Sequence, residues 1–321
     1  MPIYQNPFAS LTWLSDYKFP FLTENKGTPQ STLEFIRAKT GERYLLPPVS
    51  PAGRIMEGAY PIVISYQLDD STYLLRWRHF DFLIDSQGKS VVCYSDHGVP
   101  DQLVWLLLSG LVASFLLMLQ GTLAIHASGV VVDQGAVCLM GFSRSGKSTI
   151  ATALARGGSY WLADDTIAVD LWDGNPIVHP SSPVIKLREE SAKHFQLFTG
   201  VAIEEKEEVP IKTAGIVAAT GYHHLRTVYS LHCHREPLHP IIRPLHGASQ
   251  LLQLLPHVRA AELAPPSLQT LLFNRCNQLT QAIRFVEFHY PYGLENLSTI
   301  CKVLLEDIQR NSSRLGFSAS G

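Results

Sequence analysis

The residues with the clearest capacity for chemistry are residues 141–148, which read Gly-Phe-Ser-Arg-Ser-Gly-Lys-Ser. This is the G-x-x-x-x-G-K-S pattern of a phosphate-binding loop. It follows an apolar strand pattern at 136–140 and precedes a helical pattern, as such a loop requires. Its glycines let the backbone wrap around phosphates, with N–H groups and the start of the helix facing the anion. The sequence therefore predicts a binding site for ATP and Mg²⁺.

Two side chains of this loop are suited to phosphate chemistry. In the pattern, the lysine (Lys147) reaches the β- and γ-phosphates, and the serine that follows (Ser148) binds Mg²⁺ through its hydroxyl. The residues expected to contact the nucleotide are Gly141, Ser143, Arg144, Ser145, Gly146, Lys147, Ser148 and Thr149.

Two consecutive aspartates, Asp164 and Asp165, end the apolar run 160–163 and begin 17 residues after Lys147. An acidic residue at the end of a strand beside a phosphate loop commonly binds Mg²⁺, directly or through water. Two in succession allow one to serve the metal while the other accepts the proton of an attacking hydroxyl. We expect Asp164 to join Ser148 at the metal and the pair to be catalytic. The pattern leaves open which aspartate is the base.

A single histidine, His126, lies within the strand pattern Ile-His-Ala-Ser-Gly at 125–129. A lone histidine in an apolar strand is usually a core residue with satisfied hydrogen bonds. This strand leads through a tight turn at 133–135 into the strand before the phosphate loop, so its start can also lie near the γ-phosphate. The spacing alone leaves both interpretations open.

Together, these segments resemble a known enzyme family. The runs 126–133, 141–149 and 162–169 look like the catalytic core of HPr serine kinase/phosphorylase, whose fold is of the phosphoenolpyruvate carboxykinase type. The overall layout is closer to the HPr-kinase-like enzymes of peptide natural-product clusters, such as lasso-peptide tailoring kinases. These motifs lie within residues 126–169, and the rest of the layout matches more loosely.

The resemblance implies an α/β phosphate-loop fold of the HPr kinase C-terminal-domain type. It also implies ATP- and Mg²⁺-dependent transfer of phosphate to a hydroxyl, with serine of a peptide or protein as the expected acceptor. In the resemblance His126 lies at the active site, beside Lys147, Asp164 and Asp165 as the other catalytic residues.

The sequence differs from that family at Thr149, just after the loop, and in residues 183–190. Thr149 stands where HPr kinases usually have glutamate, and Lys186 replaces a metal-binding glutamate. Residues 183–190 also lack the Gly-rich signature of the phosphorylase-competent enzymes. These departures weaken the case for HPr as acceptor and for the reverse phosphorolysis. Lys186 and Arg188 alternate on one strand, so they either face the phosphates or form a solvated strand face.

The positioning elements suggest three parts: a β-rich N-terminal region (1–101), a phosphate-loop catalytic domain (102–310) and a flexible tail (311–321). The predicted helices cover residues 103–119, 148–156, 247–255, 266–280 and 293–309, with a strand at 283–289. Residues 103–119 form an uncharged apolar segment whose length is at the short limit for a membrane span. They have no flanking Lys or Arg, so we expect a buried helix and no span.

Composition narrows the class of protein. The 321 residues carry a net charge of −2 and are 46% hydrophobic, which is typical of a globular chain with a large core. No Lys/Arg-rich block occurs, so nucleic acid is not an expected partner. The five cysteines are scattered without CxxC spacing, and no secretion signal is visible at the start. Both observations favour the cytoplasm.

Other functions stay open at this stage. The acceptor can instead be a small-molecule hydroxyl, or the chain can be a nucleotide-binding switch, although no N-K-x-D or LSGGQ-like motif follows the loop. A homo-oligomer is compatible with the sequence. The histidines at 232, 234 and 239 form an incomplete ligand set, so we expect no metal there. The charged run 204–208 is expected to be a solvated loop or a segment over the active site, with Lys206 or Lys212 reaching phosphate.

Overall fold

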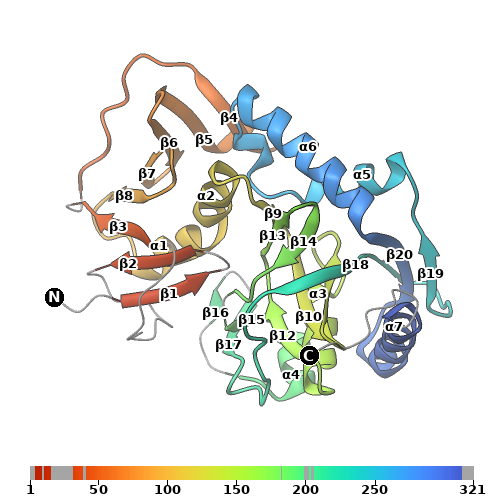
Figure 1. Ribbon diagram of the computed structural model, residues 1–321. Helices are drawn as coiled ribbons and strands as arrows, with labels where there is room; N and C mark the ends of the chain where they lie inside the picture. Colours follow the sequence, from red (N-terminus) through yellow and green to blue (C-terminus); the bar gives the residue numbers. More distant parts are fainter. Residues whose placement is uncertain are drawn as a thin grey trace. The chain divides into compact units, whose positions relative to one another are not determined.

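The computed structural model describes residues 4–8, 11–15, 32–38, 41–181, 183–198, 202–203 and 206–312. The chain divides into two compact units, whose helices and strands are labelled in Figure 1. Unit 1 comprises Met1–Ala124 and Val258–Cys276, and unit 2 comprises Ile125–His257 and Asn277–Gly321. The chain therefore leaves unit 1, forms most of unit 2, returns to unit 1 and ends in unit 2.

Unit 1 is built on a sheet with eight strands among the described residues, in the order β1-β2-β3-β8-β7-β6-β5-β4. Strands β4 to β8 form an antiparallel meander, whereas β3 pairs in parallel with β2 and β8. The strands are β1 (Tyr4–Phe8), β2 (Leu11–Ser15), β3 (Thr32–Arg37), β4 (Pro51–Glu57), β5 (Tyr60–Asp69), β6 (Thr72–Trp77), β7 (Phe80–Asp85) and β8 (Ser90–Ser95). The prediction of a mostly β N-terminal region is confirmed.

The apolar segment Asp101–Leu119 belongs to unit 1 and consists of α1 (Asp101–Leu107), a π-helical turn (Leu108–Val112) and α2 (Ala113–Leu119). In the part of the chain that the structure describes, it is the one helix long and apolar enough to cross a membrane, with a mean hydropathy of 2.2. However, 61% of its most apolar window is buried inside the protein. In α2, the ring of Phe115 packs edge-on against Tyr73 of β6, with ring centroids 5.6 Å apart. The segment is therefore mostly buried against the sheet, as predicted.

The division into units differs from the predicted boundary at residue 102. The segment Asp101–Leu119 belongs to the unit of the N-terminal strands, where most of its apolar side chains are buried and Phe115 packs on Tyr73. The later segment Val258–Cys276 also returns to unit 1, where the Ser65 hydroxyl donates a hydrogen bond to the Leu263 carbonyl at 2.7 Å. Of the predicted tail 311–321, the first two residues end a helix and residues 313–321 lie outside the described residues.

A buried carboxylate, Asp81 of β7, connects the sheet of unit 1 to the segment before β4. It is 0% exposed and accepts hydrogen bonds of 2.8–3.0 Å from the guanidinium groups of Arg43 and Arg76, and one of 3.1 Å from the backbone of Tyr44. Burial raises the pKa of Asp81, but the hydrogen bonds from Arg43 and Arg76 outweigh it and hold that pKa below 3.8.

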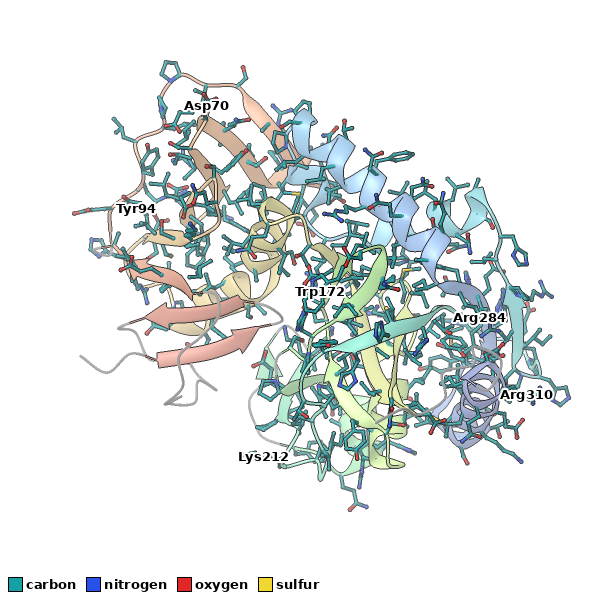
Figure 2. All side chains as sticks on the ribbon, viewed as in Figure 1. Asp70, Tyr94, Trp172, Lys212, Arg284 and Arg310 are labelled. Atoms are coloured by element: carbon teal, nitrogen blue, oxygen red, sulfur yellow. The ribbon has the colours of Figure 1, made fainter. Side chains whose placement is uncertain are left out.

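We expect Asp81→Asn to destabilise the protein by about 3 kcal/mol, because two partly buried guanidiniums lose their counter-charge. Since the folded pKa lies below the unfolded one, the stability from Asp81 is present above pH 3.8 and is lost as the pH falls through the folded pKa. Urea unfolding followed by tryptophan fluorescence measures both effects. The exposed Asp70 in the β5–β6 turn (Figure 2) provides the control Asp70→Asn. Equal unfolding midpoints for the two variants would contradict the account.

Unit 2 contains a mixed sheet in which β12, β10, β11, β18, β14 and β13 lie in that order. Strand β20 also pairs with β18, and β19 pairs with the other edge of β20. The chain enters the unit through β9 (Leu123–Ile125). The strands are β10 (Ala127–Val132), β11 (Gly135–Met140), β12 (Tyr160–Ala163), β13 (Ile167–Trp172), β14 (Asn175–Val178), β18 (His223–His234), β19 (Ile241–Pro244) and β20 (Arg284–Pro291). The α/β class of the prediction is confirmed.

Three neighbouring strands of this sheet, β11, β18 and β20, run in parallel. The carboxyl ends of parallel strands meet at one edge, where open α/β sheets commonly bind ligands. The residues that follow β11 are those of the phosphate-loop pattern, so this loop lies beside the ends of β18 and β20.

Two helices, α3 (Lys147–Arg156) and α7 (Leu297–Ser312), contact each other and the sheet of unit 2 (Figure 1). Ile150 and Leu154 of α3 and Ile300 and Leu304 of α7 belong to one buried core with the strands. Arg284 (Figure 2), which begins β20, donates hydrogen bonds of 2.6 and 3.1 Å to Asp307 of α7. This packing fixes the start of α3, and with it the phosphate loop.

A smaller antiparallel sheet completes unit 2, in the order β15-β17-β16. Its strands are β15 (Val184–Arg188), β16 (Ala202–Ile203) and β17 (Lys206–Pro210). The expectation of a solvated loop at 204–208 is therefore wrong for residues 206–208, which form a strand; residues 204–205 lie outside the described part. Helix α4 (Glu189–Phe195) was not predicted, although acidic residues in its first turn and basic residues in its last are typical of a helix.

The remaining helices agree with the sequence patterns. The predicted helices at 247–255, 266–280 and 293–309 appear as α5 (Ala248–Leu254), α6 (Pro266–Ala282) and α7, the last preceded by the 3-10 turn Leu294–Asn296. Two further 3-10 turns are Leu255–His257 and Ala261–Leu263.

Candidate nucleotide and catalytic site

The phosphate loop connects β11 to α3, and both of its glycines are required by its shape. Gly146 has φ of +83°, a left-handed conformation that favours glycine, and it begins α3. A Cβ atom on Gly141 would lie 2.6 Å from the Ser145 hydroxyl and 3.0 Å from the Leu231 carbonyl. The loop can therefore curve tightly against Leu231 of β18.

Lys147 lies across this loop. Its side chain is 8% exposed, and its Nζ donates hydrogen bonds to the carbonyls of Gly141 (2.7 Å) and Phe142 (3.2 Å). The buried hydroxyl of Ser145 has no hydrogen-bond partner among the described residues, while its carbonyl accepts a hydrogen bond from the Tyr290 hydroxyl. A buried hydroxyl without a partner is costly, and an anion in the loop would give it one.

Asp164 is 5% exposed and accepts hydrogen bonds from four donors. Its Oδ1 accepts from the hydroxyls of Ser128 (2.6 Å) and Ser148 (2.8 Å) and from the backbone of Asp165 (3.0 Å), and its Oδ2 accepts from the backbone of Lys186 (2.9 Å). These bonds fix the carboxylate next to the first residues of α3. The pairing of Asp164 with the Ser148 hydroxyl creates a set of oxygen ligands of the type that Mg²⁺ prefers.

Asp165 is held in a different way. Its backbone has φ of +70°, and its carboxylate is 21% exposed, so one side of it faces solvent. The Nδ1–H of His126 donates to the Asp165 carbonyl at 3.0 Å and lies 3.4 Å from Oδ1, while Lys186 Nζ lies 3.6 Å from Oδ2. Two basic groups thus flank a carboxylate that is accessible to a substrate, an arrangement suited to a general base.

One cavity of about 760 Å³ joins these groups, and it lies within unit 2. Apart from Gly141, every predicted site residue lines it; the Gly141 carbonyl instead accepts the hydrogen bond from Lys147. The lining residues are 143–150, His126, Asp164, Asp165, Lys186, Arg188, Glu190, Ser191, Lys206, Cys233, Arg235, 290–294, Leu297 and Ile300.

One wall of the cavity was not predicted from the sequence: it is formed by the ends of β18 and β20 and contributes Cys233, Arg235 and residues 290–294. This wall depends on the parallel pairing of β18 with β11 and of β20 with β18, and no local sequence pattern reveals that strand order. Burial raises the pKa of the Cys233 thiol and of the Tyr290 hydroxyl, so both are neutral at pH 7.

Glu208 of β17 was also missed. It is 4% exposed and lies opposite Lys186 in the pairing of β17 with β15. Burial raises the pKa of Glu208; the charge of Lys186 lowers it, and the charge of Asp165 raises it again. Glu208 is therefore a buried part of the strand pair that supports Lys186.

The histidines at the end of β18 form a compact group with β20. The rings of His232 and His289 stack with centroids 4.8 Å apart, His234 Nε2 lies 3.0 Å from His289 Nδ1, and His289 Nε2 lies 3.2 Å from Glu287. Burial, followed by the charge of His289, lowers the pKa of His232. No group of three or more His, Cys, Asp or Glu side chains in the described part of the chain could hold a metal ion.

His257 lies beneath the loop, with its ring centroid 5.0 Å from that of Phe142 and its carbonyl accepting a 2.7 Å hydrogen bond from the backbone of His126. Burial, followed by the charges of Lys147 and His232, lowers the pKa of His257 to about 4. The ring is therefore neutral at pH 7 and adds no positive charge beside Lys147.

We expect the protein to lose stability as the pH falls from 6.5 to 4, because the unfolded chain then binds a proton that folded His257 does not. His257→Gln should reduce this loss by about 3 kcal/mol, from about 1.4 kcal/mol per pH unit. Urea unfolding at pH 7 and at pH 4.5 measures the difference, with the exposed His246→Gln as control. An unchanged pH dependence in His257→Gln would contradict the burial of a neutral ring.

No family model and no curated protein matches the chain. Among solved structures, it is similar to the HPr(Ser) kinase/phosphatase from Coxiella burnetii, at 17% sequence identity and a TM-score of 0.33. The similarity covers 59% of this chain and 98% of that one. A likeness of this extent supports no argument about what the chain binds or does, so the geometry of the cavity must carry the functional proposal.

Proposed function

We propose that the chain is an ATP- and Mg²⁺-dependent kinase that transfers the γ-phosphoryl group to a hydroxyl, with serine of a peptide or protein as the acceptor. The observation that carries the proposal is the grouping in one cavity of Lys147 and Ser148 on a phosphate loop, Asp164 bonded to Ser148, and the accessible carboxylate of Asp165. These are the parts that phosphoryl transfer requires.

The residues present fit a nucleotide with Mg²⁺. Lys147 and the unpartnered hydroxyl of Ser145 lie on the phosphate loop, where the start of α3 also favours an anion. Ser148 and Asp164 would hold Mg²⁺. When bound, that ion neutralises charge on the β- and γ-phosphates.

In this proposal Asp165 is the base and Asp164 is the metal residue, because Asp164 is nearly buried and fully hydrogen-bonded whereas Asp165 retains exposure. The acceptor oxygen attacks the γ-phosphorus while its proton passes to the Asp165 carboxylate. The bond from the γ-phosphorus to the bridging oxygen breaks, and ADP leaves. His126 and Lys186 hold Asp165 in position through their contacts with its carbonyl and carboxylate.

Two further proposals concern the setting of the reaction. All five cysteines are free thiols, which supports the cytoplasm as the compartment. The alternative acceptor for the same site is a small-molecule hydroxyl.

The test is the fate of label from γ-labelled ATP, with purified protein, Mg²⁺ and cell extract. We expect label in a peptide or protein species, in an acid-stable ester as serine phosphate would be. Label in a small metabolite would replace the acceptor class and retain the kinase. Label only as inorganic phosphate, or no release, would overturn the kinase proposal in favour of a switch or a binding module.

A further inference from the structure

Lys186 of β15 contacts both members of the aspartate pair. Its backbone N–H donates a 2.9 Å hydrogen bond to Asp164 Oδ2, and its side-chain Nζ lies 3.6 Å from Asp165 Oδ2. The first contact belongs to the main chain, so it holds this part of β15 at the aspartates whatever the side chain is. The second places an ammonium group beside the proposed base, on a side chain that is 20% exposed and lines the cavity.

Lys186 also has a carboxylate across the strand pair. Glu208 of β17 is 4% exposed and lies directly opposite Lys186, on the same face of the small sheet. Burial raises the pKa of Glu208, and the charge of Lys186 opposes that rise. The same face carries Arg188 and Lys206, which oppose each other two residues further along. Glu208 therefore gives the ammonium group a counter-charge that does not depend on Asp165.

The charge beside Lys186 changes during the proposed transfer. The acceptor oxygen must lie about 3 Å from the Asp165 carboxylate to pass on its proton, and about 3–3.5 Å from the γ-phosphorus to react with it. A cation 3.6 Å from that carboxylate is therefore within reach of the γ-phosphoryl oxygens. When the proton arrives, Asp165 becomes neutral and its attraction for Lys186 falls. The ammonium group can then bind the phosphoryl oxygens more strongly in the transition state than in the ground state, which accelerates the reaction.

We propose that Lys186 is a catalytic residue whose ammonium group passes from Asp165 to an oxygen of the transferring phosphoryl group. Lys147 binds the phosphates from the loop, and Lys186 binds the γ-phosphoryl group from the side of the acceptor. The bonds that form and break, and the proton transfer to Asp165, are those of the proposed function. The inference rests on that function and deepens it, because it adds a cation that acts on the phosphoryl group itself and not through the base.

The test compares two ligands of the full-length protein. Mg²⁺·ADP with aluminium fluoride mimics the phosphoryl group during transfer, and Mg²⁺·AMP-PNP mimics the ground state; calorimetry gives both dissociation constants. Lys186→Gln should weaken binding of the aluminium fluoride complex about 10²-fold, as for loss of one preorganised group at developing charge. Its affinity for AMP-PNP should stay within about threefold, because the contact belongs to the transition state. The rate of label transfer should fall by the same factor as the first affinity.

Three further variants control for charge and folding. Lys186→Arg keeps the charge but changes its shape, so its rate should lie within about tenfold of the wild type. Lys186→Gln combined with Glu208→Gln removes both charges of the opposed pair, so that buried Glu208 is not left ionised opposite a neutral side chain; this protein should fold and show the loss of Lys186→Gln. Lys212 is exposed and does not line the cavity, so Lys212→Gln should bind both ligands as the wild type does.

A double-mutant cycle with Asp165→Asn separates this role from mere positioning of the base. If Lys186 acts on the phosphoryl group, Lys186→Gln should weaken the aluminium fluoride complex in the Asp165→Asn background as well. Disappearance of the loss in that background would assign Lys186 to positioning and overturn the inference, as would equal losses for both ligands. Failure of the proposed function shows differently, as absence of label transfer by the wild type; transfer by Lys186→Gln at the wild-type rate would overturn the inference alone.

Discussion

Lys147→Ala is expected to reduce phosphoryl transfer by about 10³-fold, which is the upper range for removal of one preorganised donor to developing charge. Lys147 is 8% exposed and lies across the phosphate loop on the carbonyls of Gly141 and Phe142. In this position its ammonium group can move from those carbonyls to the β- and γ-phosphates over a short distance. The alanine side chain of the variant carries no positive charge that could stabilise the β- and γ-phosphates.

The measurement is the rate of label transfer from γ-labelled ATP at equal concentrations of folded protein. Lys212→Ala is the control, because Lys212 (Figure 2) is an exposed lysine of the same unit outside the cavity. The melting temperature should show that the loop variant is folded, since α3 remains packed on the sheet through Ile150 and Leu154. More than a tenth of wild-type transfer in Lys147→Ala would contradict the role of this side chain.

Asp165→Asn is the second large effect, with an expected loss of turnover of about 10²–10⁴-fold, as for removal of a general base. Asparagine tolerates the left-handed backbone of this position, where φ is +70°. It also keeps the size of the side chain between His126 and Lys186. The affinity for Mg²⁺·AMP-PNP should therefore be unchanged, so that the loss lies in kcat.

Asp164→Asn is the contrasting variant and should fail for a different reason. If its Oδ1 keeps the bonds from Ser128 and Ser148, its amide nitrogen faces the backbone N–H of Lys186, which now donates to Oδ2 at 2.9 Å. Two opposed donors, one of them buried, cost about 1–3 kcal/mol. We expect a lower melting temperature together with weaker Mg²⁺-dependent nucleotide binding. Identical behaviour of the two variants would contradict the division of roles between the aspartates.

Local patterns were sufficient to predict the phosphate loop and the aspartate pair. The loop is a continuous motif between a strand and a helix, and the aspartates directly follow a strand, so the positions of both could be predicted from short segments. The spacing alone left the role of His126 open, and only the family resemblance placed it at the active site; the structure brings its Nδ1 within 3.4 Å of Asp165 Oδ1. The long apolar segment could also be predicted as buried, because its flanks lack the charges of a membrane span.

Features that depend on distant parts of the chain could not be predicted. Cys233 and Arg235 line the cavity because β18 pairs in parallel with β11. The order of strands in a sheet cannot be predicted from the hydrophobic periodicity of one segment. The run around Glu208 has the composition of a solvated loop, yet its pairing with β15 buries that side chain. The two units differ from the predicted domains because Val258–Cys276 returns to unit 1. The hydrogen bond between Ser65 and Leu263 in that unit joins residues 198 positions apart in the sequence.

The central claim is that the cavity transfers phosphate and does more than bind nucleotide. The most direct test compares wild type with Asp165→Asn in two quantities: the dissociation constant for Mg²⁺·AMP-PNP, and the rate at which γ-label leaves ATP for an acceptor in the same extract. The account predicts equal dissociation constants and a rate at least 10²-fold lower in the variant. Equal rates in the two proteins, or nucleotide binding without any transfer by the wild type, would contradict it.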